Sequence, residues 1–226
     1  MTAVSAKVQL VLTAERLFAQ YGINGVSLRQ ISLEAGNGNN SAVAYHFGSR
    51  DGLIHAIFEN RLIEMSDRRA ELFARAMPSH DGDELRTWLT SYLLPIVDQA
   101  EQPGNYYLSF LEELRRFDNI ARYFDRLPVE YRVMTEQFYD QVDRLLLEVP
   151  APIRRDRVFQ VMQMAVTASA DRERAHRHGR PTSPFETHFT SMLDGLIGYL
   201  RAPISPTTLQ ALADAAALAP IPRNSA

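Results

Sequence analysis

The sequence contains no cysteine, and this absence excludes several kinds of chemistry at once. Disulfide bonds, cysteine-ligated zinc and thiol catalysis all need a residue that the chain does not have. Long apolar runs are missing too: no stretch of about 18 apolar residues occurs, so we expect no membrane-spanning helix. The first residues lack a basic segment followed by an apolar core, so we expect no signal peptide and a cytoplasmic protein.

Positive charge is scarce, because the 226-residue chain has a formal net charge of −3 at pH 7. Its first 65 residues hold only Lys7, Arg16, Arg29, Arg50 and Arg61 as basic side chains, balanced by a similar number of acids. No strong basic patch is therefore predicted. Net charge averages over the whole molecule, however, and a nucleic-acid-binding face needs only local positive potential.

Alternating strand patterns and hairpin signals are absent, whereas apolar residues recur at helical spacing along the chain. The sequence therefore predicts an all-α protein, with an N-terminal three-helix head and a larger helical domain. We place the head at residues 1–48 and the helical domain at 49–226. The sequence predicts a first helix at 5–21, then two short helices, and then a long helix from Ser49 to Phe73 or Met77. The later predicted helices span residues 83–101, 105–117, about 118–127, 128 to about 148, 153–178, 184–202 and 207–219.

The first of two short helices in the head begins after Ser27. The Ser27 hydroxyl can accept from the free N–H groups of the opening turn, and Gln30 can complete a capping box. Leu28, Ile31 and Ala35 share one face at the i, i+3, i+7 spacing of a buried stripe. This pattern predicts a helix that lies against a core.

A Gly/Asn turn at 36–38 ends this helix, and residues 39–41 offer the cap of a second short helix. Val43 and Phe47 are predicted to face inward, and Ser49 is predicted to cap the long helix that follows. Two short helices joined by a tight turn are typical of a helix-turn-helix. The residues predicted to point outward on the second helix are Asn40, Ser41, Ala42 and Tyr45.

A set of residues between positions 8 and 55 forms a recognisable pattern. These residues are Ala14, Leu17, Phe18, Tyr21, Gly22, Ser27, Ile31, Ala35, Gly36, His46, Phe47, Ser49, Arg50 and Leu53. With them, residues 8–55 resemble the N-terminal domain of the tetracycline-repressor-like (TetR) family of bacterial transcription regulators. The resemblance implies a homodimer that reads a palindromic operator in double-stranded DNA, with a small-molecule effector pocket and the dimer interface in the helical domain.

The chain departs from the family pattern around the recognition helix. The turn at Asn37–Asn40 is one residue longer, so the resemblance does not fix the register of base contacts. Ala44 stands where the family has a tyrosine, and Tyr45 follows one position later. Arg50 replaces the common lysine and keeps its charge.

Nine residues of the head are candidates for DNA contact. Asparagine suits the N6/N7 edge of adenine, and polar side chains at helix starts suit phosphates. A cap or a solvated surface charge is the alternative for each residue, and packing beside Phe47 is the alternative for His46. The candidates are Ser27, Arg29, Gln30, Asn39, Asn40, Ser41, Tyr45, His46 and Arg50.

Aromatic side chains gather on the helices of the middle of the chain. Such residues line small-molecule pockets, which predicts a largely apolar effector, and ordinary core packing is the alternative. The candidates are Trp88, Tyr92, Tyr106, Phe110, Tyr131 and Phe138.

The last two long helices carry bulky apolar stripes that could build a four-helix bundle with a second copy of the chain. In a monomer the same faces would bury against each other. The interface candidates are Val158, Met162, Ala165, Phe185, Phe189, Met192, Leu196 and Tyr199.

No enzyme signature occurs: the sequence lacks G-x-S-x-G, a P-loop, H-E-x-x-H and a Gly-rich dinucleotide turn. His176, His178 and His188 are read as surface residues, since no acid-rich partner set accompanies them. We therefore expect no catalytic residue, cofactor, metal or membrane partner. The competing hypothesis is a helical adaptor whose helix-turn-helix does not read DNA.

Overall fold

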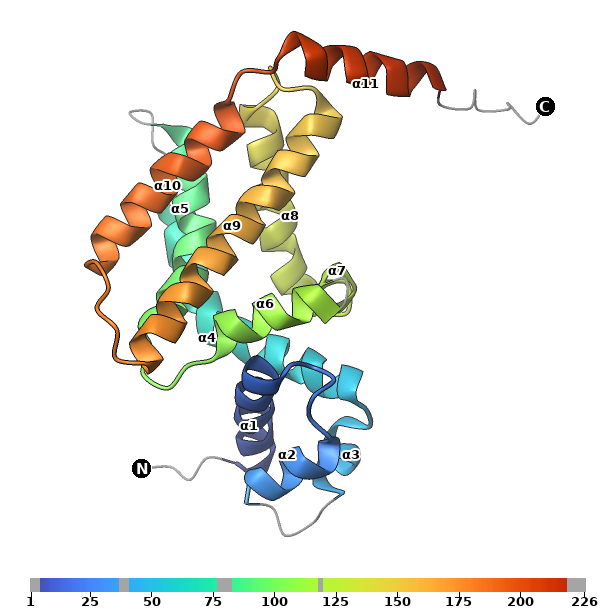
Figure 1. The fold of residues 1–226 in the computed structure, drawn as a ribbon, viewed down its shortest axis with the longest axis vertical. Helices are drawn as coiled ribbons and strands as arrows, with labels where there is room; N and C mark the ends of the chain where they lie inside the picture. The colour runs from blue at the N-terminus through green and yellow to red at the C-terminus, as the bar shows by residue number, and fades with distance from the viewer. Residues whose placement is uncertain (1–4, 37–40, 77–82, 118–119, 219–226) are drawn as a thin grey trace, which may run out of the picture.

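The computed structural model describes residues 5–36, 41–76, 83–117 and 120–218, and these ranges hold helices and no strand. The all-α prediction is therefore confirmed. Three helices, α1 (Ala6–Tyr21), α2 (Leu28–Glu34) and α3 (Ala42–Phe47), form a small head at one end of the molecule (Figure 1). The long helix α4 (Arg50–Ala76) begins in the head and runs into a larger helical body.

The body contains the remaining helices, and most of their bounds lie close to the predicted ones. The predicted helix 83–101 continues past Val97 as a 3-10 helix, and the predicted helix 118–127 is reduced to a single turn. The elements are α5 (Glu84–Val97), η1 (Asp98–Glu101), α6 (Tyr107–Phe117), α7 (Ala121–Phe124), α8 (Val129–Leu145), α9 (Ala151–Arg177), α10 (Phe185–Arg201) and α11 (Pro206–Leu218).

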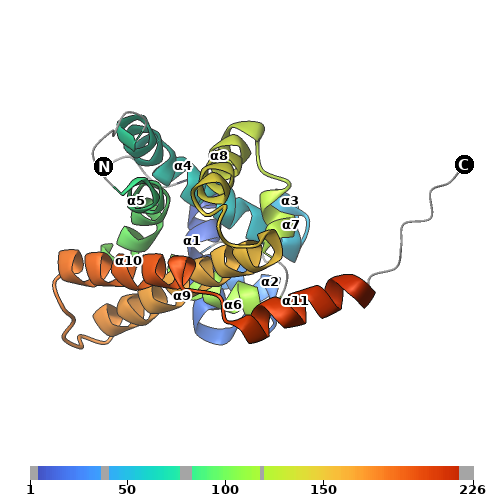
Figure 2. The same cartoon turned by 90° about the horizontal axis from the view of Figure 1, so that it is seen from above.

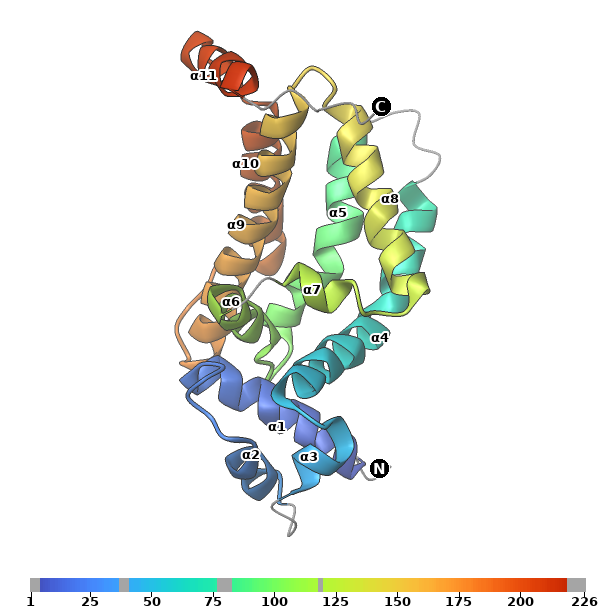
Figure 3. The ribbon, with the colours of Figure 1, turned by 90° about the vertical axis from the view of Figure 1, so that its right-hand side faces the viewer.

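The body has two layers above the head. One layer is the pair α9 and α10, and the other is α5 and α8 with the end of α4 (Figure 3). Helices α6 and α7 cross between the body and the head, and α6 packs on both α1 and α9. Seen from above, α11 runs away from the body (Figure 2). In the described ranges, no helix is long and apolar enough to cross a membrane.

The hydrophobic core falls into two clusters. The first joins the head to the middle of the molecule, because Phe18 of α1, Phe58 of α4 and Phe110 of α6 are all fully buried in it. The second fills the body between α5, α8, α9 and α10. The first half of α4 therefore packs with the head.

Candidate functional site

Helices α2 and α3 are the two short helices of the predicted helix-turn-helix. Helix α2 opens on Ser27, whose hydroxyl accepts the N–H of Gln30 at 3.1 Å. The predicted cap is therefore present, while no hydrogen bond back from the Gln30 side chain to Ser27 occurs in the described part of the chain. Residues 37–40, which include the candidates Asn39 and Asn40, lie outside the described residues.

The start of α3 is tied to α2 by Ser32, a residue to which the sequence assigned no role. Its side chain is fully buried, and its hydroxyl donates to the Leu28 carbonyl at 3.2 Å and accepts the Val43 N–H at 3.4 Å. The cap had been predicted from residues 39–41, but the Ser41 side chain makes no capping hydrogen bond. Ser32 lies inside α2, but its hydroxyl caps the start of α3. The sequence gives no signal of this role, because a capping residue is sought just before the helix that it caps.

Ala42 was predicted to face outward, and this prediction is wrong. The residue is only 3% exposed and belongs to the first core cluster. Helix α3 begins at Ala42, so its first turn packs against the head rather than toward solvent. A small side chain at this position lets the start of α3 approach α2 closely.

The outward surface of α3 is dominated by Tyr45, which is 82% exposed. Its ring meets the His46 ring edge-on, with centroids 5.0 Å apart. Both side chains project from a helix that the core holds through Val43, so they are available to a large partner. The candidates that lie at the surface of the head are Ser27, Arg29, Gln30, Ser41, Tyr45 and His46.

Arg50 is only half-exposed, because its guanidinium is engaged within the head. It donates to the carbonyls of Ile23 and Val26, the latter at 2.8 Å, and to Asn24 Oδ1 at 3.3 Å. These bonds fix the turn between α1 and α2 to the start of α4. The structure therefore places this candidate as a side chain that positions the head, with most of its donors already used.

The head has two exposed cations that no described ion pair engages, Lys7 and Arg29. Lys7 was not among the candidates, yet its Nζ lies 5.9 Å from the centroid of the Phe47 ring at the end of α3. Arg16, by contrast, pairs with Glu34 at 2.8 Å. Tertiary packing thus brings Lys7 beside the recognition helix, although 40 residues of sequence separate the two.

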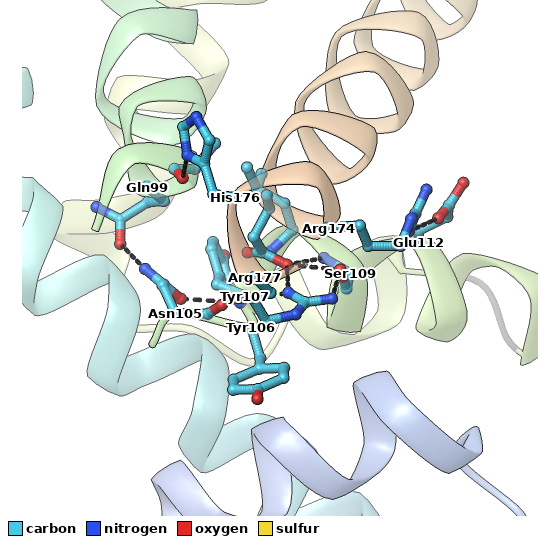
Figure 4. Close-up of polar contacts among 12 residues, drawn as sticks. Gln99, Asn105, Tyr106, Tyr107, Ser109, Glu112, Arg174, His176 and Arg177 are labelled. Carbon is cyan, nitrogen blue, oxygen red and sulfur yellow. Dashed lines mark hydrogen bonds and ion pairs between the residues drawn. The ribbon is translucent and has the colours of Figure 1, made fainter. Parts of the chain in front are cut away.

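Buried charges join the head to the body. Arg61 of α4 donates from Nε to Glu15 Oε2 of α1 at 2.7 Å and from Nη2 to Asn105 Oδ1 at 2.9 Å. All three residues are less than one-tenth exposed. The Asn105 side chain also accepts the Tyr107 N–H at 2.9 Å, so the same cluster fixes the start of α6 (Figure 4).

Glu173 of α9 holds α6 from its other side. Its carboxylate accepts the N–H groups of Leu108 and Ser109 at 3.0 and 3.1 Å, which are free donors of the first turn of α6. Arg177 pairs with Glu173 at 2.6 Å and lies over the ring of Tyr106, 4.4 Å from its centroid (Figure 4). Helix α6 is therefore fixed to both α1 and α9.

The six residues predicted to line an effector pocket do not form one site. Phe110 belongs to the first core cluster and Tyr131 packs against it, while Tyr106 lies under Arg177. The others, Trp88, Tyr92 and Phe138, lie in the core of the body. The Tyr92 and Phe138 rings stack with centroids 4.0 Å apart, so this pair joins α5 to α8.

Half of the predicted dimer residues are buried within the single chain. Val158, Ala165, Phe189 and Leu196 are each less than one-tenth exposed, because α9 and α10 pack on each other and on α5. Met162, Phe185 and Met192 are half-buried. Apolar periodicity thus identified mainly the residues that the protomer buries between its own helices. Of the eight candidates, Tyr199 is the one that the structure leaves exposed, at 38%.

Other residues of α9 form the exposed apolar face. Phe159 is 63% exposed and Met164 is 40% exposed, and with Tyr199 they border an open hollow of about 720 Å³. The hollow is otherwise lined by polar side chains of α6 and α9. These are Arg115, Arg116, Gln160 and Gln163.

The histidines singled out in the sequence lie near α9 and α10. His176 contacts the Ala100 carbonyl through Nδ1 at 3.0 Å and Thr182 Oγ1 through Nε2 at 2.9 Å (Figure 4). His178 is exposed at the end of α9, and His188 is half-buried in α10. Within the described ranges, no group of three His, Asp or Glu side chains is arranged to hold a metal ion.

With a capped α2, a core-packed α3 and an exposed α3 surface, the head has the architecture of a helix-turn-helix DNA-binding domain. Residues 10–57 match the family described as bacterial regulatory proteins, tetR family. The N-terminal domain of the chain therefore belongs to the tetR family. No curated protein sequence matches the chain.

Solved structures extend the likeness to the whole fold. AmtR of Mycobacterium smegmatis is similar over 98% of this chain and 99% of its own, with a TM-score of 0.53 and 16% identity. The fatty acid degradation regulator FadR from Bacillus halodurans is similar over 89% of this chain and 98% of its own, with a TM-score of 0.52 and 11% identity. The chain thus has the fold of a tetR-family regulator, with a DNA-binding domain at its N-terminus.

Proposed function

We propose that this protein is a cytoplasmic transcription repressor, without enzymatic activity, that binds a palindromic operator as a homodimer and is released by a small-molecule effector. The main support for the proposal is that Tyr45 and His46 lie at the surface of a short helix, which the core of the head holds in place. A major groove admits one such helix, and its exposed side chains then reach base edges. Arg29 and Lys7 would contact phosphates on either side.

The dimer rests on the exposed face of α9 and α10. Exposed Phe159, Met164 and Tyr199 form an apolar edge around the open hollow, and a second copy would bury it.

Release by an effector would act through the helices that join the two parts. Helix α4 begins beside α3 and ends in the body, and α6 is fixed to α1 and α9 by buried charges. A ligand that binds one arrangement of the body more tightly would therefore shift the head as well. The domain division at residue 48 stays a prediction, with α4 shared by both parts.

The test is a titration of the protein with DNA from its own upstream region at two salt concentrations. We expect tight, salt-sensitive binding by a dimer, because phosphate contacts release counterions. Tyr45→Ala should weaken binding by about 1–3 kcal/mol in a sequence-dependent way, whereas Tyr139→Ala, an exposed tyrosine of the body, should not. The titration is repeated with small molecules extracted from cells, in case binding needs one. If the protein binds its upstream DNA no more tightly than unrelated DNA in both titrations, the adaptor hypothesis is favoured.

The dimer is tested separately by sedimentation. Phe159→Glu places a charge on the exposed apolar face and should give monomers that lose DNA affinity. The matched control is Leu147→Glu, because Leu147 is equally apolar and 70% exposed but does not line the hollow. A dimer that tolerates Phe159→Glu would refute this face as the interface.

A further inference from the structure

Arg69 is a guanidinium enclosed in the body of the protein. It lies on α4, it is 4% exposed, and its Nε is buried without a hydrogen-bond partner. No ion pair or hydrogen bond joins its guanidinium to another residue in the described ranges. Within the described part of the chain, the positive charge of this side chain therefore has no counter-charge.

The other buried arginines of the described ranges are all paired. Arg61 binds Glu15, Arg154 binds Asp143, and Arg172 binds Glu101, each with a nitrogen–oxygen distance of 2.5 Å. An arginine cannot lose its proton inside a protein, so burial of an unpaired one is strongly unfavourable. Among these buried arginines, Arg69 is thus the exception.

The surroundings of Arg69 suit a ligand with an apolar part. The guanidinium lies over the ring of Tyr92, 5.0 Å from its centroid, and Tyr92 stacks on Phe138. Tyr107 lies near enough that the charge of Arg69 opposes the rise in its hydroxyl pKa caused by burial. Aromatic walls with a few convergent polar groups are typical of small-molecule sites.

We propose that Arg69 anchors an organic monocarboxylate in the body, with the acid group on the guanidinium and the apolar part of the ligand beside Tyr92 and Phe138. One buried cation balances one negative charge, and a planar carboxylate matches the fork of an arginine. A phosphate monoester brings a charge of about −1.5 to −2 near neutral pH, which a single arginine does not balance. The inference rests on the proposed function in that this acid is the effector.

The position of Arg69 on α4 gives the site a route to the head. Arg61, two turns earlier on the same helix, makes the buried pair with Glu15 of α1. Arg50 at the start of α4 holds the turn between α1 and α2. A carboxylate that draws Arg69 toward itself therefore acts on the helix that fixes the head.

The test compares acids with neutral amides of the same shape. Benzoate, octanoate, benzamide and octanamide are titrated into the full-length protein by calorimetry, together with hexyl phosphate. At least one acid should bind tenfold or more tightly than its amide, and Arg69→Met should remove that preference. Arg144→Met, which removes an exposed arginine from α8, should keep it. The unliganded Arg69→Met protein should also unfold at a higher temperature, because an unpaired buried charge is gone.

The site is refuted if acids and amides bind alike, if none binds, if hexyl phosphate binds best, or if Arg69→Met keeps the preference. Cooperative unfolding of Arg69→Met shows that the variant is folded, so that a loss of binding is informative. DNA titration with and without the acid separates the two proposals. Acid binding without specific DNA binding would refute the regulator and keep the site. Specific DNA binding without acid binding would keep the regulator and refute the site.

Discussion

Arg61 Nε of α4 donates to Glu15 Oε2 of α1 at 2.7 Å, and both side chains are buried. The pair lies where the head meets the body, and Asn105 binds the same guanidinium from the start of α6. Three helices from distant parts of the sequence are thus held by one cluster of polar atoms. A change in any of them would alter the position of the head relative to the body.

Removing one partner of this pair should strongly destabilise the protein. Arg61→Met leaves the Glu15 carboxylate buried without its counter-charge, which we expect to cost about 3–5 kcal/mol of unfolding free energy. The double variant Glu15→Leu with Arg61→Met should recover most of that loss, because no buried charge then stays unpaired. Urea denaturation of the two variants and the native chain measures both values. A double variant as unstable as Arg61→Met would contradict this account.

Ser32→Ala should loosen the helix-turn-helix. The substitution removes the hydroxyl that accepts the Val43 N–H, so we expect a loss of about 1 kcal/mol, as for other capping residues. DNA affinity should fall with an unchanged salt slope, because no phosphate contact is lost. Hydrogen exchange at the start of α3 is the direct measurement. Unchanged protection of the Val43 amide would show that the cap has no effect there.

Gly52→Ala should destabilise the protein although Gly52 lies in a helix. A Cβ at this position would come within 2.1 Å of the Phe47 carbonyl oxygen, at the end of α3. We expect this clash to cost about 1–3 kcal/mol. Gly198→Ala is the control, since a Cβ there meets nothing within 4 Å. The higher helix propensity of alanine should raise the unfolding free energy of this variant by about 1 kcal/mol. Thermal unfolding compares the two, and equal stabilisation would disprove the clash.

His188 should make the protein less stable in mild acid. Burial and the nearby Arg172 lower the pKa of His188 below its ordinary value of 6.5, so the folded state disfavours the charged form. Its Nε2 is also buried and has no hydrogen-bond partner among the described residues. The stability that neutral His188 contributes is complete above pH 6.5 and is lost as the pH falls through the lowered pKa. The melting temperature between pH 7.5 and 5 should therefore fall further for the native chain than for His188→Gln; parallel curves would exclude this role.

The sequence predicted most helices well because their signals are local. Ser27 and Ser49 cap the helices that they were expected to cap, since a capping hydroxyl acts within three residues. The resemblance of residues 8–55 to the family was likewise read from neighbours in the chain, and the family match at residues 10–57 confirms that resemblance. Local spacing failed at Ala42, where the packing of α3 on the head decided the orientation.

The candidate sites depended more on packing between distant segments. Lys7 reaches Phe47 across the head, and Arg50 turns inward to the carbonyls of Ile23 and Val26. The apolar stripe of α9 and α10 contains Val158 and Leu196, which the protomer buries, whereas Phe159 and Tyr199 stay exposed. Periodicity finds an apolar face but does not say which helix will cover it.

The sequence by itself determined the all-α class, the helix-turn-helix and the absence of cysteine chemistry, because helix periods, caps and composition are local properties of the chain. Tertiary structure decided which charges are paired, which apolar residues remain exposed and which arginine is buried alone. Ion pairs and burial depend on contacts between helices far apart in the sequence. Arg61 and Arg69 look alike in the sequence of α4. Only the fold gives Arg61 a carboxylate and leaves Arg69 without one among the described residues.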